Sequence, residues 1–190
     1  MDMLDEVIGI LTYYHGENGF EMNPMVSTEI EHYARAVLDI PDDEYVMMAA
    51  RTSFTMFHRG LVIGRDAIYW RNDVSIKTTV NTLTWQQLSE RTGQFKAHRR
   101  VLELGDGAVL DNIGSLNKVS VLINLLDLLI DKYNEQEGES SGFIFEGDKV
   151  ATLVRAIPED KQAIKAESEA AAADAATVSF LDLLKKLIGK

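Results

Sequence analysis

Apolar residues recur at intervals of three and four over the first fourteen positions of the chain. Leu4, Val7, Ile8, Leu11 and Tyr14 therefore fall on one face of a helix. Acidic residues precede them, where negative charge favours the helix dipole. The pattern predicts a short amphipathic helix over residues 3–14.

A second helix is predicted before Pro41. Asn23 followed by Pro24 is typical of an N-cap with proline at the first helical position. The apolar stripe that follows consists of Val26, Ile30, Tyr33, Ala34, Val37 and Leu38. Both helices are polar on their outer sides, so we expect residues 1–41 to be a helical extension packed on a larger body.

Between residues 44 and 112 the period changes to two. β-Branched and aromatic residues alternate with polar ones between glycine-containing turns, two of which lie at residues 64–66 and 105–107. Successive hairpins favour an antiparallel sheet or a small barrel. About six strands are expected, at residues 45–53, 59–63, 67–71, 80–85, 94–104 and 108–111.

The strongest helical pattern follows at about residues 115–135. One complete apolar stripe is formed by Val119, Leu122, Ile123, Leu126, Leu129, Ile130 and Tyr133. Val121, Leu125 and Leu128 lie outside it. Because one stripe is enough to cover a sheet, we expect a second contact, made either by the N-terminal helix pair or by another protein chain.

Three further segments complete the chain. Residues 137–165 are predicted to form a small additional element, and the alanine-rich residues 166–177 a tether. Residues 178–190 predict an amphipathic helix that folds back on the domain, docks on a partner or on a like helix in an oligomer, or lies on a membrane surface. Its apolar face, the candidate partner-binding site, consists of Phe180, Leu183, Leu184, Leu187 and Ile188.

Composition narrows the class of protein. The 190 residues are 46% apolar and 26% charged, the balance of a globular protein. No cysteine is present, which excludes disulfides, a thiolate nucleophile and cysteine-based metal sites. The start of the chain is acidic, and no stretch approaches ~18 uninterrupted apolar residues, so we expect a cytoplasmic protein that does not span a membrane.

Charge is distributed unevenly. The formal net charge of −11 argues against indiscriminate binding to nucleic acid or anionic lipid. Residues 51–100, however, hold nine basic side chains against three acidic ones. This basic segment either pairs with acidic helices of the same molecule or binds an anionic partner, lipid head groups before nucleic acid. The candidate anion-binding residues are Arg51, Arg59, Arg65, Arg71, Arg99 and Arg100.

The sequence contains few residue patterns that indicate chemistry. There is no phosphate-binding glycine loop and no Gly-x-Ser-x-Gly elbow, and none of the four histidines pairs with another at metal-ligand spacing. We therefore predict no catalytic residue, no metal and no cofactor. Aromatic residues are interleaved with the arginines, namely Phe54, Phe57, Tyr69, Trp70 and Trp85. They form either an ordinary core or a surface on which nucleic-acid bases stack.

Residues 42–135 resemble the bacterial pleckstrin-homology-like domains. The resemblance rests on the order of the elements, on one long closing helix and on the hairpin of residues 59–71, an apolar strand, a turn and a short aromatic strand. It implies a bent two-sheet antiparallel barrel that is closed at one end by an α-helix and serves as a binding platform for lipids, peptides or proteins. The loop of residues 54–58, Phe-Thr-Met-Phe-His, lacks the basic cluster of the lipid-binding members.

The function expected from these features is that of a non-enzymatic adaptor. The pleckstrin-homology-like platform would bind a protein partner or mediate self-association, and the terminal helix would supply a second, tethered contact. The alternative is a peripheral anion-binding module that uses the basic segment, with weak membrane contact and little affinity for nucleic acid.

Overall fold

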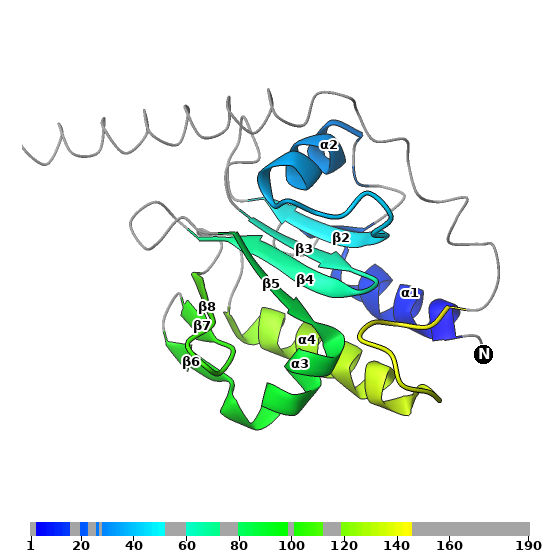
Figure 1. Ribbon diagram of the computed structural model, residues 1–190, viewed down its shortest axis with the longest axis vertical. Helices are drawn as coiled ribbons and strands as arrows, with labels where there is room; N and C mark the ends of the chain where they lie inside the picture. The colour runs from blue at the N-terminus through cyan, green and yellow to red at the C-terminus, as the bar shows by residue number, and fades with distance from the viewer. Residues whose placement is uncertain are drawn as a thin grey trace, which may run out of the picture.

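A computed structural model of the chain describes residues 3–15, 20–22, 26, 28–51, 60–72, 80–98, 101–111 and 119–145. In this part of the chain, four α-helices accompany two antiparallel sheets of five and three strands (Figure 1). The predicted α+β class with antiparallel pairing is confirmed. The residues from 146 onward, which include the predicted tether and terminal helix, lie outside the described residues.

The larger sheet has the strand order β1-β2-β3-β4-β5, and each strand is antiparallel to the next. The turn Gly64-Arg65-Asp66 joins β3 to β4, as predicted. The short edge strand β1 was not predicted, because the sequence around it is rich in turn-forming residues. The five strands are β1 (Phe20–Met22), β2 (Val46–Arg51), β3 (Gly60–Gly64), β4 (Ala67–Arg71) and β5 (Val80–Thr84).

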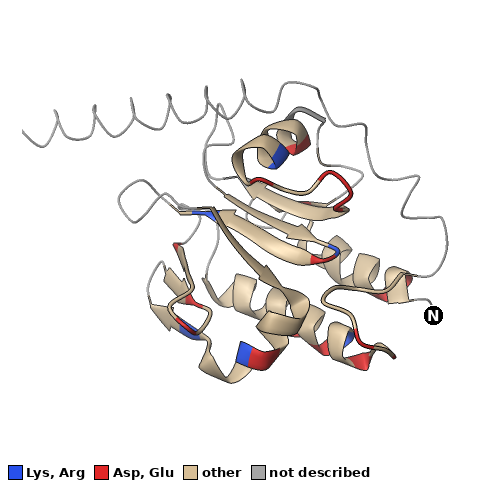
Figure 2. Cartoon of the chain, viewed as in Figure 1, with Lys and Arg blue, Asp and Glu red and all other residues tan. Residues whose placement is uncertain are grey.

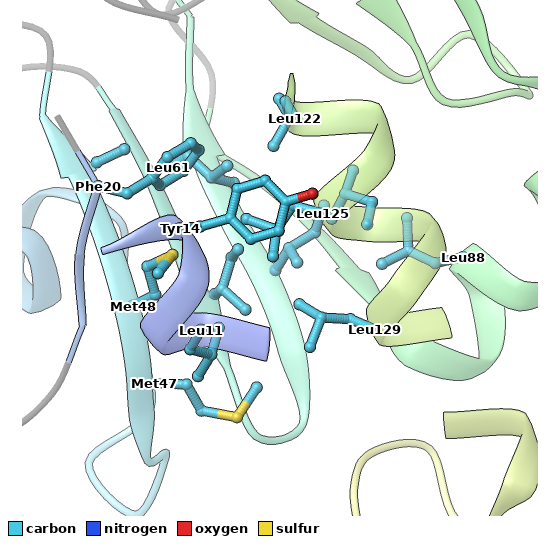
Figure 3. Close-up of a cluster of buried hydrophobic side chains, with 14 of the residues drawn as sticks. Leu11, Tyr14, Phe20, Met47, Met48, Leu61, Leu88, Leu122, Leu125 and Leu129 are labelled. Atoms are coloured by element: carbon cyan, nitrogen blue, oxygen red, sulfur yellow. The ribbon is translucent and has the colours of Figure 1, made fainter. Parts of the chain in front are cut away.

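Helices cover both faces of this sheet. Helix α2 (Thr28–Val37) packs on one face, where Val46, Ala49, Val62 and Tyr69 point toward it. Helices α1 (Met3–Tyr14) and α4 (Val119–Glu135) pack on the other, against Met48, Leu61, Ile63 and Trp70 among others (Figures 1 and 3). The central strands β3 and β4 are consequently buried along their whole length, which is why their expected apolar and polar alternation is incomplete.

An irregularity in β2 adjusts the side chains to these two layers. The register between β2 and β3 shifts between Val46 and Met48. Val46 and Ala49 face α2, whereas Met47 and Met48 both join the cluster under α1 and α4. A bulge of this kind lets two successive residues face the same side of a sheet.

Helix α2 differs from its prediction at the start. It begins at Thr28. Val26 lies in a bend before the helix, and the Val26 backbone N–H donates to the Met22 carbonyl at 3.0 Å. At its end, the buried Arg35 side chain bonds Glu31 Oε1 and the carbonyl oxygens of Pro41 and Glu44. This guanidinium fastens α2 to the segment that leads into β2.

The region after β5 corrects two predictions. Trp85 does not end a strand: it begins helix α3 (Trp85–Arg91), which Thr84 and Gln87 cap reciprocally. Residues 94–104 do not form one strand either. The short 3-10 helix η2 (Thr92–Gln94) precedes the smaller sheet, whose order is β6-β7-β8 and whose strands are β6 (Lys96–His98), β7 (Val101–Glu103) and β8 (Val109–Asp111). The predicted β7–β8 hairpin across residues 105–107 is confirmed.

The long helix α4 makes the predicted second contact. Besides the sheets, it packs against α1 and α3 (Figure 1). Leu125, which lies outside the predicted stripe, is buried, and Leu128 is 43% exposed. The N-terminal helices do not act as a pair here, since α2 lies across the sheet from α4.

The described strands form two separate sheets and do not close into a barrel. At the junction, side chains of β4 and of the residue after it bond to β8, where a closed barrel would need a ladder of backbone bonds. The barrel expected from the resemblance is therefore not found in the part of the chain described.

Candidate functional site

The buried carboxylate of Glu44 lies at the turn between β3 and β4. Its Oε2 accepts a hydrogen bond from the Tyr69 hydroxyl at 2.7 Å, and its Oε1 accepts one from the Asp66 backbone N–H at 3.1 Å. Gly64 is required beneath it, because a Cβ there would lie 2.7 Å from Glu44 Cδ. Glu44 thus closes the turn from the α2 side.

Burial dominates the electrostatics of this carboxylate. Removal from water raises the pKa of Glu44, and the hydrogen bond from Tyr69 opposes that rise only in part. Burial and the neighbouring Glu44 also raise the pKa of the Tyr69 hydroxyl, which keeps its proton and remains a donor. A buried carboxyl paired with a tyrosine could hold a proton, but both groups are engaged in holding the turn.

A strap of residues 140–143 holds the same turn from the other side. The backbone N–H of Phe143 donates to the Arg65 carbonyl at 2.9 Å, and Gln86 N–H donates to the Ser141 carbonyl at 3.2 Å. The Phe143 ring packs edge-on against Trp85, whose Nε1 donates to the Gly64 carbonyl at 3.0 Å. In its described part, which ends at residue 145, the predicted element of residues 137–165 forms neither helix nor strand.

The candidate anion-binding arginines do not gather in the described structure. Arg65 forms a bidentate pair with Asp66, with both N···O distances at 2.7 Å, and this contact raises the pKa of the guanidinium. The Arg71 side chain, at the end of β4, is buried, with the residue 9% exposed. In Figure 2 the described Lys and Arg positions are dispersed along the backbone among Asp and Glu positions. The other candidates are Arg51, Arg59, Arg99 and Arg100. The last three lie outside the described residues, and for Arg51 only the backbone is described.

The histidines that the structure describes are separated from one another. His15 Nδ1 accepts from the Met22 N–H at 3.3 Å, and His32 packs edge-on against Tyr33. His98 Nε2 lies 3.7 Å from Glu103 Oε1. Among the described residues there is no group of three or more His, Asp or Glu side chains that could hold a metal ion.

The two edges of the smaller sheet differ. On the outer side of β8, the Asn72 side chain donates to the Val109 carbonyl and accepts from the Asp111 N–H, at 2.9 and 2.8 Å, and Trp70 Nε1 also donates to Val109. On the other edge, β6 pairs only with β7 among the described residues, and all three residues of β6 are exposed.

Sequence reasoning missed Glu44 and Asn72. No pattern in the sequence marks Asn72 as a side chain that bonds to the backbone of a strand edge. Glu44 lies two residues before β2 and gives no periodic signal. The predicted partner-binding residues, from Phe180 to Ile188, fall outside the described residues.

No protein-family model, curated protein or solved structure matches the chain. Within the described ranges, every helix is too short or too polar to cross a bilayer.

Proposed function

We propose that the protein is a non-enzymatic binding or adaptor protein. A pleckstrin-homology-like platform contacts a protein partner, and the C-terminal amphipathic helix provides a second docking element. Support for the first part comes from the order of the elements, in which antiparallel strands are followed by a helix that packs on them.

One observation carries this proposal: the buried polar side chains fasten the scaffold. Arg35, Glu44, Asn72 and the indole N–H groups of Trp70 and Trp85 all bond to backbone groups of neighbouring elements. Such bonds make the frame rigid, and a rigid frame suits presentation of a surface to another protein.

The described arginines do not favour the alternative function, a peripheral module that binds anions. Of its six candidate arginines, the two whose side chains are described are paired with an acid or buried. Neither is free to meet the phosphates of a membrane surface without a cost in lost contacts.

Substitution of the terminal apolar face tests the proposal. The double variant Leu183→Asp with Leu187→Asp in the full chain is expected to abolish association, measured by light scattering for self-association and by pull-down with partners identified for the unaltered chain. The matched control is Lys185→Gln with Lys186→Gln, which changes the net charge by the same amount and keeps the apolar face.

The control is expected to bind like the unaltered chain. If both double variants lose binding equally, the contact is electrostatic and the apolar docking face is wrong. If neither does, the terminal segment is not a docking element. Circular dichroism of both variants checks that the fold is intact.

A further inference from the structure

Arg71, at the end of β4, is a buried cation, with the residue 9% exposed. Among the described residues, no hydrogen bond or ion pair engages its side chain. The other buried arginine, Arg35, bonds to a carboxylate and to two carbonyl oxygens. Arginine keeps its proton in proteins, so Arg71 stays charged. Because a buried charge without a partner destabilises a fold, an anion beside Arg71 would stabilise this one.

Although the candidate arginines form no cluster of side chains, the register of the larger sheet places Arg51 in one row with Arg71. Arg71 pairs with Gly60 of β3, and Gly60 pairs with Arg51 of β2. Neighbouring strands lie about 4.8 Å apart, so the two arginines are separated by about 10 Å across the sheet. We call these three positions, Arg51, Gly60 and Arg71, the arginine row.

The arginine row lies on the face of the sheet that α2 covers (Figure 1). Residues two apart in a strand share a face. Tyr69, two residues before Arg71, belongs to the cluster under α2, and Ala49, two residues before Arg51, belongs to it as well. The position between the two arginines is a glycine, which has no side chain. The row therefore places two cations on one face with a gap between them.

Acidic residues are scarce near this row in the sheet. Glu21 is the only acidic residue of the five strands, and it lies in β1, three strands away from Arg71. Glu44 and Asp66 meet at the turn between β3 and β4, which is at the opposite end of β4. The sheet itself thus offers Arg71 no carboxylate.

The neighbouring elements do not supply one either in the described part of the chain. The acidic residues of α2 are Glu29 and Glu31, and Glu31 Oε1 is bonded to Arg35. The smaller sheet, which carries Asp111, meets β4 on the opposite face, where the Asn72 side chain bonds to its backbone. Positive charge on the α2 face is therefore not balanced within the arginine row.

We propose that the arginine row binds the phosphate group of a small soluble molecule. The Arg71 guanidinium donates two parallel hydrogen bonds to phosphate oxygens, and Arg51 contributes the second positive charge. A phosphate has more oxygens than a carboxylate and so suits two arginines. Since Arg71 is buried, the phosphate has to enter the site, which a flat lipid surface does not do. This inference goes beyond the proposed binding function and is independent of the terminal helix.

Inorganic phosphate is the probe, added to the full chain. The Nε–H signal of Arg71 in nuclear magnetic resonance spectra, assigned by its absence from Arg71→Lys, is expected to shift until it saturates. The melting temperature is expected to rise with phosphate concentration, because phosphate binds the folded state. Sodium chloride at the same ionic strength is expected to have neither effect. Vesicles of phosphatidylcholine and phosphatidic acid, which carry the same group on a surface, are expected to leave the Arg71 signal unchanged.

Three variants test which arginine acts. Arg71→Met removes the charge and keeps an unbranched apolar stem, and it is expected to weaken phosphate binding by about tenfold or more. Arg51→Met is expected to weaken it in the same direction. Arg65→Met is the matched control, because the Arg65 guanidinium is already paired with Asp66, and it is expected to bind phosphate like the unaltered chain.

An equal loss of binding in Arg65→Met would reduce the effect to general attraction by positive charge and overturn the inference. Response to the vesicles without response to free phosphate would assign the row to a membrane and overturn it as well. If Arg71→Met fails to fold, the Arg71 signal of the unaltered chain decides: a signal that does not move with phosphate refutes the site. None of these results affects the terminal-helix experiment.

Discussion

The side chain of Asn72 bonds to Asp111 as the backbone of a neighbouring strand would. Its Oδ1 accepts from the Asp111 N–H at 2.8 Å while its Nδ2 donates to the Val109 carbonyl at 2.9 Å. One amide thereby joins the end of β4 to the edge of the smaller sheet. Trp70 Nε1, which donates to the same Val109 carbonyl, joins the two sheets together with it.

Replacing this amide should loosen the junction. Asn72→Ala is expected to lower the free energy of unfolding by about 1–3 kcal/mol, because the Asp111 N–H loses its partner in a half-buried place. Denaturant unfolding measures the change. Asn124→Ala, at an exposed position of α4, is the control and should alter stability by less than about 0.5 kcal/mol. Equal effects of the two substitutions would mean that Asn72 does not join the sheets.

Helix α4 should be sensitive to truncation on its buried side. Leu126 is fully buried, so Leu126→Ala is expected to destabilise the fold by about 2–5 kcal/mol through lost contacts and a residual cavity. The same substitution at Leu128, which is 43% exposed, should cost less than about 1 kcal/mol. Thermal or denaturant unfolding compares them. An effect below about 0.5 kcal/mol at Leu126 would contradict its place in the core.

Glu44 should make stability depend on pH in an unusual direction. Its pKa is raised in the folded protein, so the native state holds a proton that the unfolded state has already released. The contribution of Glu44 is therefore most favourable below the ordinary glutamate pKa and is lost as pH rises through the folded pKa. The free energy of unfolding of the unaltered chain, minus that of Glu44→Gln, is expected to fall as pH rises from about 4 upward.

Glu6 supplies a control of opposite sign. Its contact with Lys132, whose Nζ lies 2.8 Å from Glu6 Oε2, lowers the pKa of the carboxyl. The free energy of unfolding of the unaltered chain, minus that of Glu6→Gln, should fall as pH decreases through the pKa of Glu6 in the folded protein. If both differences change in the same direction, the assignment for Glu44 is wrong.

The strap after α4 should not tolerate a side chain at Gly142. A Cβ there would lie 2.5 Å from Asp66 Cα and 2.8 Å from the Arg65 carbonyl oxygen, both of the backbone. Gly142→Ala is expected to displace the strap and cost about 1–3 kcal/mol. At Gly93 nothing lies within 4 Å of the added carbon, so Gly93→Ala is the matched control, and unfolding by denaturant compares the two. A stable Gly142→Ala protein with unchanged tryptophan fluorescence would show that the strap adapts.

Local patterns predicted much of this fold. The stripe of α4 and the hairpins around residues 64–66 and 105–107 depend on neighbours in the sequence, and the structure has them. Trp85 was assigned to a strand because an aromatic residue favours one, although Thr84 and Gln87 form a capping box that marks a helix start. This capping box is a more specific local signal than the general preference of an aromatic residue for strands.

The candidate site depended on long-range contacts instead. Glu44 meets Tyr69 across 25 positions of sequence, and Asn72 meets Asp111 across 39. No periodicity reports such pairings, because each needs the sheet to exist first. Ile8 shows the same limit on a small scale, since it lies within the predicted apolar face of α1 and is yet 38% exposed.

The packing of α1 against α4 has a consequence for synthesis on the ribosome. Helix α1 contributes Val7 and Leu11 to a core that α4, more than a hundred residues later in the chain, completes. Until α4 has left the exit tunnel, those side chains lack their final neighbours and are open to adventitious association. Synthesis therefore leaves the apolar face of α1 exposed to aggregation for longer than a contact between sequence neighbours would.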